Sequence, residues 1–330
     1  MRLSPETNVL AYQYTRSKTT GATNGPGSMP DAEIEPARAV ERAAALIRAG
    51  KLVAFPTETV YGLGANALDE AAVERIFLAK GRPRTSPLIV HVDSIDMACE
   101  LADEWPDAAN ILARRYWPGP LTIVVTKRPQ IPDIVTAGLP TVGLRMPAHR
   151  LALALIRAAG VPIAAPSANR FTELSPTSAA HVAESLADFV LDGGPSQVGI
   201  ESTVISLAKE PVLLRPGVIP LPEIEELIGS VHVAIRPAEG GHPAPGMHER
   251  HYRPKTPLYL MRPGDRVPDG RGAWLHIGHE MPSEPRAYAA ALYETLHSLD
   301  RQGFDWIAVE RPPDTPEWAG VVDRLQRAAV

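Results

Sequence analysis

Three clusters of polar and charged residues in this sequence could bind an anionic ligand. Residues 56–67 contain two threonines and two glycines and are predicted to form one long polar loop after the short apolar segment 52–55. Residues 80–91 place three cations and two hydroxyl groups on a proline-punctuated stretch. Residues 166–170 carry a serine, an asparagine and an arginine after another apolar segment. Arginine offers a planar fork and lysine a compact charge, so the second cluster in particular suits a polyphosphate.

Each of these residue types also has a structural explanation. The helix dipole favours lysine and arginine at the carboxyl end of a helix. The charges of residues 80–84 are therefore consistent with two alternatives, a ligand site or a solvated helix end. Ser167 and Asn169 are ordinary turn residues as well as donors to phosphate or ribose oxygens. His91, in an apolar segment, is more typical of a satisfied buried histidine than of a ligand-binding one. Arg145 follows an apolar segment and needs a partner, either a substrate carboxylate or an internal aspartate.

The common nucleotide-binding motifs and cysteine sites are weak or absent. Gly62, Gly64 and Ala67 have the G-x-G-x-x-A spacing, but six residues separate the first glycine from the preceding apolar segment, whereas in a dinucleotide fingerprint it follows the strand at once. No G-x-x-x-x-G-K-[ST] loop occurs in the sequence, which excludes a P-loop. The single cysteine, Cys99, excludes an internal disulfide framework and a cysteine-based zinc site.

The segments expected to position the clusters alternate between helices and short strands. A helix is predicted from Pro36 until Gly50, with a strand directly after it. Beyond these, helices are predicted at 71–80, 107–116 and 151–159, and strands at 88–92, 121–126, 141–144, 162–165, 203–207 and 212–214. This alternation predicts an α/β domain with a mixed, largely buried sheet. Ligands bind outside strand carboxyl ends in such sheets, so the clusters should meet there with residues 201–203 and 215–217.

Composition divides the chain into four segments. Residues 1–30 are polar and lack helical periodicity, which predicts disorder, and residues 25–29 resemble an engineered junction before a native start. Residues 31–236 form the first α/β domain, and the glycine- and proline-dense residues 237–257 form a linker. Residues 258–330 alternate again between strand and helix patterns and predict a smaller Rossmann-like domain.

Charge and hydropathy restrict the function classes. A net charge of −5 and a pI near 6.1 argue against a protein that coats nucleic acid or an acidic membrane. No apolar run approaches the roughly 20 residues that span a bilayer, and the amino terminus lacks a signal-peptide core, so we expect no membrane contact and a cytoplasmic location.

Taken in order, these motifs resemble the YrdC/Sua5 family of threonylcarbamoyl-AMP synthases. The resemblance rests on residues 56–67, 80–83, 87–91, 117–122, 145–147, 166–169, 201–204 and 215–217. Residues 245–247, the pair His251-Tyr252 and the small second domain favour the two-domain Sua5 form. The resemblance implies a YrdC-like mixed twisted sheet with an open concave site at 31–236, a lid at 237–257 and a Sua5-type domain at 258–330. Carbamoyltransferases with a similar module also carry zinc-finger cysteines, which this chain lacks.

The resemblance implies roles for particular residues. Lys80 and Arg82 would be catalytic, and magnesium would be held mainly through ATP phosphates rather than by protein ligands. The threonine-binding residues would be Thr59, His91, Arg145 and Ser202. The ATP-binding residues would be Lys80, Arg82, Ser86, Thr141, Ser167, Asn169, Ser175, Arg215 and Tyr252.

The implied reaction joins L-threonine, bicarbonate and ATP into threonylcarbamoyl-AMP with release of pyrophosphate. A threonylcarbamoyl-transferase machinery would then use the product to make N6-threonylcarbamoyladenosine at position 37 of tRNA. In the lid, residues 248–250 and Arg253 differ from the family's usual pattern, whereas His251 and Tyr252 match it.

Two other functions remain open at this point. A double-stranded RNA- or tRNA-binding module without turnover would bind with a steep salt dependence, although the acidic net charge counts against this as the main role. An NAD-dependent oxidoreductase would rest only on the weak glycine pattern. Neither alternative explains residues 80–91 and 167–169 together.

Overall fold

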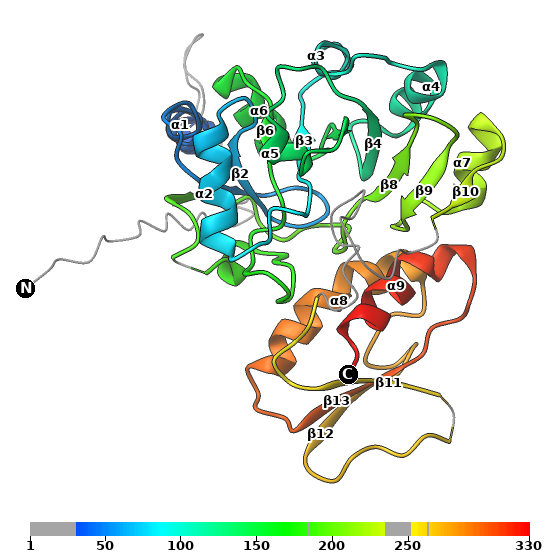
Figure 1. Cartoon of the computed structure of the whole chain (residues 1–330). Coiled ribbons are helices and arrows are strands. Elements are labelled where there is room, and N and C mark those ends of the chain that lie inside the picture. Colours follow the sequence, from blue (N-terminus) through cyan, green and yellow to red (C-terminus); the bar gives the residue numbers. More distant parts are fainter. Residues whose placement is uncertain (1–30, 184, 235–251, 263) are drawn as a thin grey trace, which may run out of the picture.

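The computed structural model describes residues 31–183, 185–234, 252–262 and 264–330, which form two α/β domains (Figure 1). Residues 1–30, which were predicted to be disordered, lie outside the described residues. So does most of the predicted linker, including His251. No helix in the described part of the chain is long and apolar enough to cross a membrane.

The first domain is built on a ten-stranded mixed sheet with the order β10-β9-β8-β4-β5-β3-β6-β2-β1-β7. Parallel and antiparallel pairs are interspersed, for example β3 with β5 (parallel) and β4 with β5 (antiparallel). This confirms the predicted mixed sheet. Its strands are β1 (Val53–Phe55), β2 (Gly62–Asn66), β3 (Ile89–His91), β4 (Leu121–Thr126), β5 (Thr141–Arg145), β6 (Ile163–Ala164), β7 (Phe189–Val190), β8 (Thr203–Ser206), β9 (Val212–Arg215) and β10 (His232–Val233).

Successive residues of a strand point to opposite faces of the sheet. Both faces of this sheet carry buried apolar side chains, and helices cover each of them. In β1, Ala54 packs in one core with α2 and α4, whereas Val53 and Phe55 pack in the other with α1 and α6. The helices of the domain are α1 (Asp31–Arg48), α2 (Glu70–Lys80), α3 (Ile95–Leu101), α4 (Asp107–Tyr116), α5 (Asp133–Thr136), α6 (Arg150–Ala159), the short 3-10 helix η1 (Ala179–His181) and α7 (Leu221–Ile228).

Local signals explain where α2 begins and ends. The Asp69 side chain accepts a hydrogen bond from the amide of Ala72, which caps the first turn. Gly81 ends the helix with a left-handed φ of 64°, which glycine adopts without steric cost. The helix therefore stops directly after Lys80 and leaves Arg82 at the start of the following loop.

The interpretation of residues 56–67 as one long loop is wrong for its second half. Residues 62–66 form β2, which pairs antiparallel with β1 through Phe55 and Gly62. Glycine has low strand propensity, but here the ring of Phe55 fills the space that side chains would occupy. A Cβ atom at Gly64 would lie 2.8 Å from that ring. The loop is thus the turn of a β-hairpin and spans only residues 56–61.

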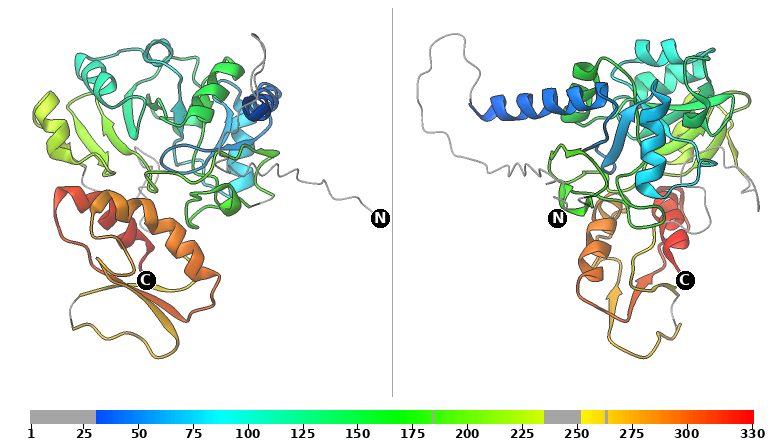
Figure 2. Two further views of the ribbon diagram at one scale, coloured as in Figure 1. Left: turned by 180° about the vertical axis from the view of Figure 1, so that it is seen from behind. Right: turned by 60° about the vertical axis from the view of Figure 1, so that its left-hand side comes forward.

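The second domain is a small α/β unit, as the sequence predicted. Its sheet is fully parallel, with the order β11-β13-β12. Helices α8 and α9 lie between this sheet and the first domain (Figures 1 and 2). Its elements are β11 (Leu258–Met261), β12 (Gly272–Leu275), α8 (Pro285–Asp300), β13 (Trp306–Glu310), η2 (Pro316–Trp318) and α9 (Ala319–Ala328).

The two domains share one hydrophobic core and touch backbone to backbone. Val60 and Ile200 of the first domain pack in the same cluster as Leu292 and Tyr293 of α8. A Cβ atom on Gly320 of α9 would lie 2.5 Å from the carbonyl oxygen of Gly217. The second domain therefore lies directly against the segment that follows β9.

Candidate active site

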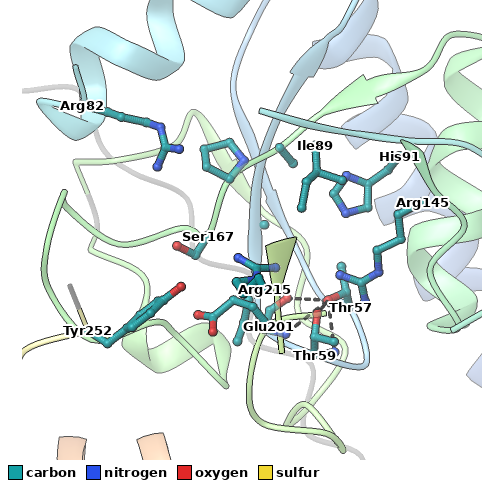
Figure 3. A pocket seen from close by; sticks show the side chains of 14 residues that line it. Thr57, Thr59, Arg82, Ile89, His91, Arg145, Ser167, Glu201, Arg215 and Tyr252 are labelled. Atoms are coloured by element: carbon teal, nitrogen blue, oxygen red, sulfur yellow. Dashed lines mark hydrogen bonds between the residues drawn. The ribbon is translucent and has the colours of Figure 1, made fainter. Parts of the chain in front are cut away.

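A pocket at the centre of the first domain brings most of the predicted site residues together (Figure 3). Arg82 and Arg145 point into it from opposite ends, and Arg215 lies between them. Its other lining residues come from the β1–β2 turn, the start of β2, β3, the segment after β6, the segment before β8 and the segment that begins at Tyr252. They are Thr57, Thr59, Val60, Gly62, Ile89, His91, Ala165, Pro166, Ser167, Glu201 and Tyr252.

The β1–β2 turn is fixed by the hydroxyl of Thr57. This hydroxyl donates to the carbonyl of Val60 at 2.6 Å and accepts from the amides of Thr59 and Val60 at 3.2 Å each. The Thr57 and Thr59 hydroxyls lie 2.9 Å apart. Thr59 was among the predicted site residues, but Thr57 was not. The position of Thr57 just after a predicted strand could have indicated that it belongs to the site.

Arg145, at the end of β5, has an internal partner in addition to facing the pocket. Its Nη2 donates to Oε1 of Glu58 at 2.7 Å, and its Nε donates to the carbonyl of Gly119 at 3.3 Å. The other carboxylate oxygen of Glu58 accepts from the amide of Ala148 at 2.9 Å. The internal partner is therefore a glutamate rather than the aspartate considered from sequence, and it sets the direction of the guanidinium.

His91 is buried beside Arg145 and is held in its neutral form. Burial and the charge of Arg145 lower the pKa of His91 to about 3. The edge of its ring meets Phe55 with a centroid distance of 5.8 Å. Its Nδ1 has no hydrogen-bond partner within the described residues. A buried nitrogen without a partner in the wall of a pocket favours contact with a ligand, which the sequence had ranked as the less typical role.

Arg82 lines the other end of the pocket, and Lys80 is buried behind the wall there, outside the pocket lining. Lys80 Nζ donates to the carbonyl of Ser167 at 2.5 Å and to that of Asn169, while Arg82 Nη2 donates to the hydroxyl of Ser86 at 2.5 Å. Burial and the neighbouring Arg82 charge lower the pKa of Lys80, and burial lowers that of Arg82 to about 10. No carboxylate pairs with either side chain within the described residues. An anion bound there would stabilise both charges.

Arg215, at the end of β9, is held by Ser202. Its Nε and Nη2 donate to the carbonyl of Ser202 at 3.1 and 3.0 Å, and Nη2 also donates to the Ser202 hydroxyl at 3.1 Å. That hydroxyl lies 2.7 Å from the hydroxyl of Thr122. Ser202 therefore lies behind the pocket wall and supports Arg215, although the family resemblance gave it a threonine contact.

Other predicted residues also lie behind the wall. Ser86 and Ser175 contact the lining residues Arg82 and Glu201, and Oδ1 of Asn169 is buried without a partner within the described residues. Thr141 is separated from this group. It begins β5 and pairs with Thr126, four residues or about 13 Å along the strand from Arg145.

Tyr252, which precedes the first strand of the second domain in the chain, lines one side of the pocket. Its backbone has a left-handed φ of 63°, which is uncommon for a residue with a side chain. The next residue, Arg253, donates its amide to the carbonyl of Thr172 at 2.9 Å. The ring of Tyr252 is buried near Arg324, whose guanidinium carbon lies 5.4 Å from the ring centroid.

The donor groups suit an anionic ligand that brings its own cation. Within the described residues, no group of three or more histidine, cysteine, aspartate or glutamate side chains could hold a metal ion. The carboxylate of Glu201 accepts from Ser175 and from Arg324 at 2.5 and 2.7 Å. The cationic wall fits the oxygens of an anionic ligand such as a phosphate.

Fold and pocket together define an α/β protein with a buried pocket that three arginines line, Arg82, Arg145 and Arg215. A family model named for Sua5, YciO and YrdC and described as "Telomere recombination" matches residues 45–217. A second, described as "Threonylcarbamoyl-AMP synthase, C-terminal domain", matches residues 219–330. The chain belongs to the Sua5/YciO/YrdC family, in its two-domain Sua5 form.

Similar proteins extend over almost the whole chain. The threonylcarbamoyl-AMP synthase of Pyrococcus abyssi is 45% identical over 317 residues, which cover 87% of this chain and 93% of the relative. That of Bacillus subtilis is 42% identical over 320 residues, covering 88% and 92%. The crystal structure of P. abyssi Sua5 complexed with L-threonine superimposes with a TM-score of 0.82 at 42% identity, over 88% of this chain and 94% of that one.

Proposed function

We propose that this chain is an L-threonylcarbamoyladenylate synthase, a nucleotidyltransferase that forms threonylcarbamoyl-AMP and pyrophosphate from L-threonine, bicarbonate and ATP. The observation that carries the proposal is that the two ends of the pocket present different charged side chains. A carboxylate-binding fork, Arg145, lies at one end and the cation Arg82 lies at the other (Figure 3). Lys80 lies behind the pocket wall, where its Nζ donates to the carbonyl of the lining residue Ser167. The similarity to synthases over most of the chain supports the same reaction.

The two ends divide the substrates between them. Threonine binds through its carboxylate to Arg145 and through its polar groups to Thr59 and His91, with Ser202 in support. ATP binds with its phosphates toward the cations, and magnesium supplies further positive charge to the phosphate oxygens. Of the proposed ATP-binding residues, Arg82, Ser167, Arg215 and Tyr252 line the pocket. Lys80, Ser86, Asn169 and Ser175 support them from behind the wall, and Thr141 lies apart at the start of β5.

The chemistry needs no covalent enzyme intermediate. The threonine amine attacks bicarbonate and loses water to give a carbamate. A carbamate oxygen then attacks the α-phosphorus of ATP, and the bond to the β-phosphate oxygen breaks to release pyrophosphate. Lys80 and Arg82 stabilise the negative charge that develops on the phosphate oxygens, while Arg145 orients the nucleophile. His91, neutral at physiological pH, acts as a hydrogen-bonding group.

The product is a mixed anhydride, so a cytoplasmic transferase must consume it. We propose that this partner is the threonylcarbamoyl-transferase machinery that modifies adenosine 37 of tRNA. Weak tRNA binding by this chain would ease the transfer.

Pyrophosphate release from ATP tests the proposal. With bicarbonate present, threonine should stimulate release by the full chain, and Lys80→Ala should lower the rate about 100-fold or more. Arg75→Ala is the matched control, since Arg75 also lies on α2 but pairs with Asp188 at the surface at 3.3 Å. Threonine-independent release, or no release at all, would refute the synthase function.

A further inference from the structure

Helix α9 of the second domain inserts a fully buried arginine behind the pocket. The Arg324 side chain is 0% exposed, and its Nε donates to Oε2 of Glu201 at 2.7 Å. Its Nη1 donates to the carbonyl of Pro216 at 2.8 Å, and its Nη2 donates to the carbonyl of Glu201 at 3.1 Å. One guanidinium thus joins the segment before β8 to the segment after β9, across the domain interface.

Both anchor points are direct chain neighbours of Ser202 and Arg215, the pair that places a guanidinium between Arg82 and Arg145. Glu201 precedes Ser202, whose carbonyl accepts two hydrogen bonds from Arg215. Pro216 follows Arg215 in the chain. Because Arg324 fixes the carbonyls of Glu201 and Pro216, it also fixes the separation of Ser202 and Arg215.

The ion pair between Arg324 and Glu201 also affects the net charge of the pocket wall. Among the described residues that line the pocket, Glu201 is the one with a carboxylate, and it is 7% exposed. Burial by itself raises the pKa of Glu201, but the charges of Arg324 and Arg215 and the hydrogen bond from Ser175 lower it, so the group is an anion. A buried anion without a compensating partner would repel phosphate and attract Arg215.

We propose that Arg324 is a positioning residue for the ATP site, which neutralises Glu201 and keeps Arg215 directed toward the phosphates; this inference rests on the proposed function. Domain docking alone would not require a cation at this depth. The ion pair between Arg286 of α8 and Glu223 of α7 joins the same two domains at the surface, with 3.8 Å between charged atoms.

Titration calorimetry on the full chain, with magnesium-ATP and separately with threonine, tests the inference. Arg324→Gln removes the charge but retains a hydrogen-bond donor, so the Kd for ATP should rise on the order of tenfold or more. Threonine affinity should change little, since Arg145 lies at the other end of the pocket (Figure 3). Adding Glu201→Gln should restore ATP binding, because it removes the anion that would otherwise compete with phosphate for Arg215. Asp323, the other carboxylate beside Arg324, keeps its ion pair with Arg327 at 3.0 Å. Arg286→Gln is the control and should leave both affinities unchanged.

The outcomes separate charge compensation from a purely structural role. An unchanged Kd for ATP in Arg324→Gln would overturn the inference, as would a loss that Glu201→Gln does not rescue. Arg324→Lys keeps the charge and provides a second measurement if the glutamine variant fails to fold. Because lysine keeps the charge but loses the planar fork, this variant should bind ATP more weakly than the wild type but more tightly than the uncharged Arg324→Met. Equal losses in the lysine and methionine variants would also overturn the inference. If the wild type itself binds no ATP, the proposed function fails, and the inference fails with it.

Discussion

Arg145 shows how a buried charge can be both satisfied and available for binding. Its guanidinium is 4% exposed and contacts Glu58 and the carbonyl of Gly119, yet it also forms part of the pocket wall. The contact with Glu58 restricts its rotation, so less conformational entropy is lost when a carboxylate binds. Orientation by an internal partner therefore prepares the residue for its proposed substrate.

Replacing Arg145 with lysine should separate the two substrates. Lysine keeps the charge but loses the planar fork, so we expect the KM for threonine to rise about 10- to 100-fold with little change in the KM for ATP. Steady-state pyrophosphate release, with each substrate varied in turn, measures both constants. Arg128→Lys is the control, because Arg128 donates to the carbonyl of Ala102 outside the pocket. A change mainly in the KM for ATP would contradict the assignment of threonine to this end.

At the scale of elements, the contact between α9 and the segment after β9 depends on two glycines. Gly217 and Gly320 allow the two backbones to touch, and an added Cβ on Gly217 would itself lie 2.4 Å from the amide nitrogen of Thr203. Neither position leaves room for even one methyl group. Helix α9 can approach the site only because both residues lack side chains.

The variant Gly320→Ala should weaken this contact. Because the new methyl group would meet the carbonyl of Gly217, α9 must shift, and we expect a loss of about 1–3 kcal/mol in the free energy of unfolding. Chemical denaturation measures the change. Gln326→Ala, at an exposed position of the same helix, should be close to neutral. A neutral or stabilising effect of Gly320→Ala would show that the helices readily repack.

The sequence predicted elements well where the pattern was local. The helix predicted at 107–116 is α4, and the helix at 71–80 begins one residue earlier as α2. Strand β2 was missed because its residues, Gly-Leu-Gly-Ala-Asn, are suited to pairing only beside Phe55. Helix α7, Leu221–Ile228, was also missed. Strand β2 depends on tertiary neighbours that a short window of sequence does not contain. Helix α7 carries local signals instead, with a proline in its first turn and Gly229 directly after its end, and could have been predicted from them.

The site was predictable to a similar extent. Charged residues at the ends of predicted elements identified Arg82 after a helix and Arg145 and Arg215 after strands, because residue type and position are both visible in sequence. The ligand-binding role of His91 came only from the family resemblance. The pairing of Glu201 with Arg324 was not visible, since 123 positions separate the two residues. Long-range ion pairs are set by domain packing, which no local pattern indicates.

At the scale of the whole molecule, a pair of stacked histidines lies at the domain interface. The rings of His181, in η1, and His297, in α8, lie 3.8 Å apart between centroids and within 21° of parallel. His297 Nε2 lies 3.1 Å from the carbonyl of Ser175, and His181 Nε2 lies 3.5 Å from Glu294. Burial lowers the pKa of both histidines to about 4, with Arg301 contributing for His181 and His181 for His297.

Stability should therefore fall as the solution is acidified. An unfolded histidine has a pKa near 6.5, so between about 6.5 and 4 the unfolded chain binds more protons than the folded chain. The contribution of the neutral pair is present above pH 6.5 and is lost as the pH falls toward 4. Melting temperatures of the wild type and His297→Gln at pH 7.5 and pH 5 test this.

The variant should lose less stability on acidification than the wild type does. Its amide can still donate to the carbonyl of Ser175, whereas the protonatable ring is gone. His232→Gln, at an exposed position of β10, is the control and should behave like the wild type. Equal losses in wild type and His297→Gln would show that other groups govern the acid response.

The ion pair between Glu201 and Arg324 also has a consequence for how such chains can evolve. The two residues belong to different domains but form one electrostatic unit, so neither domain can be exchanged freely between relatives. A chimera whose second domain lacked a cation at position 324 would inherit a defective nucleotide site even if its domains docked correctly. A chain that lost the second domain altogether would gain from a neutral residue at position 201. We therefore expect the residues at positions 201 and 324 to change together among relatives, although they belong to different domains.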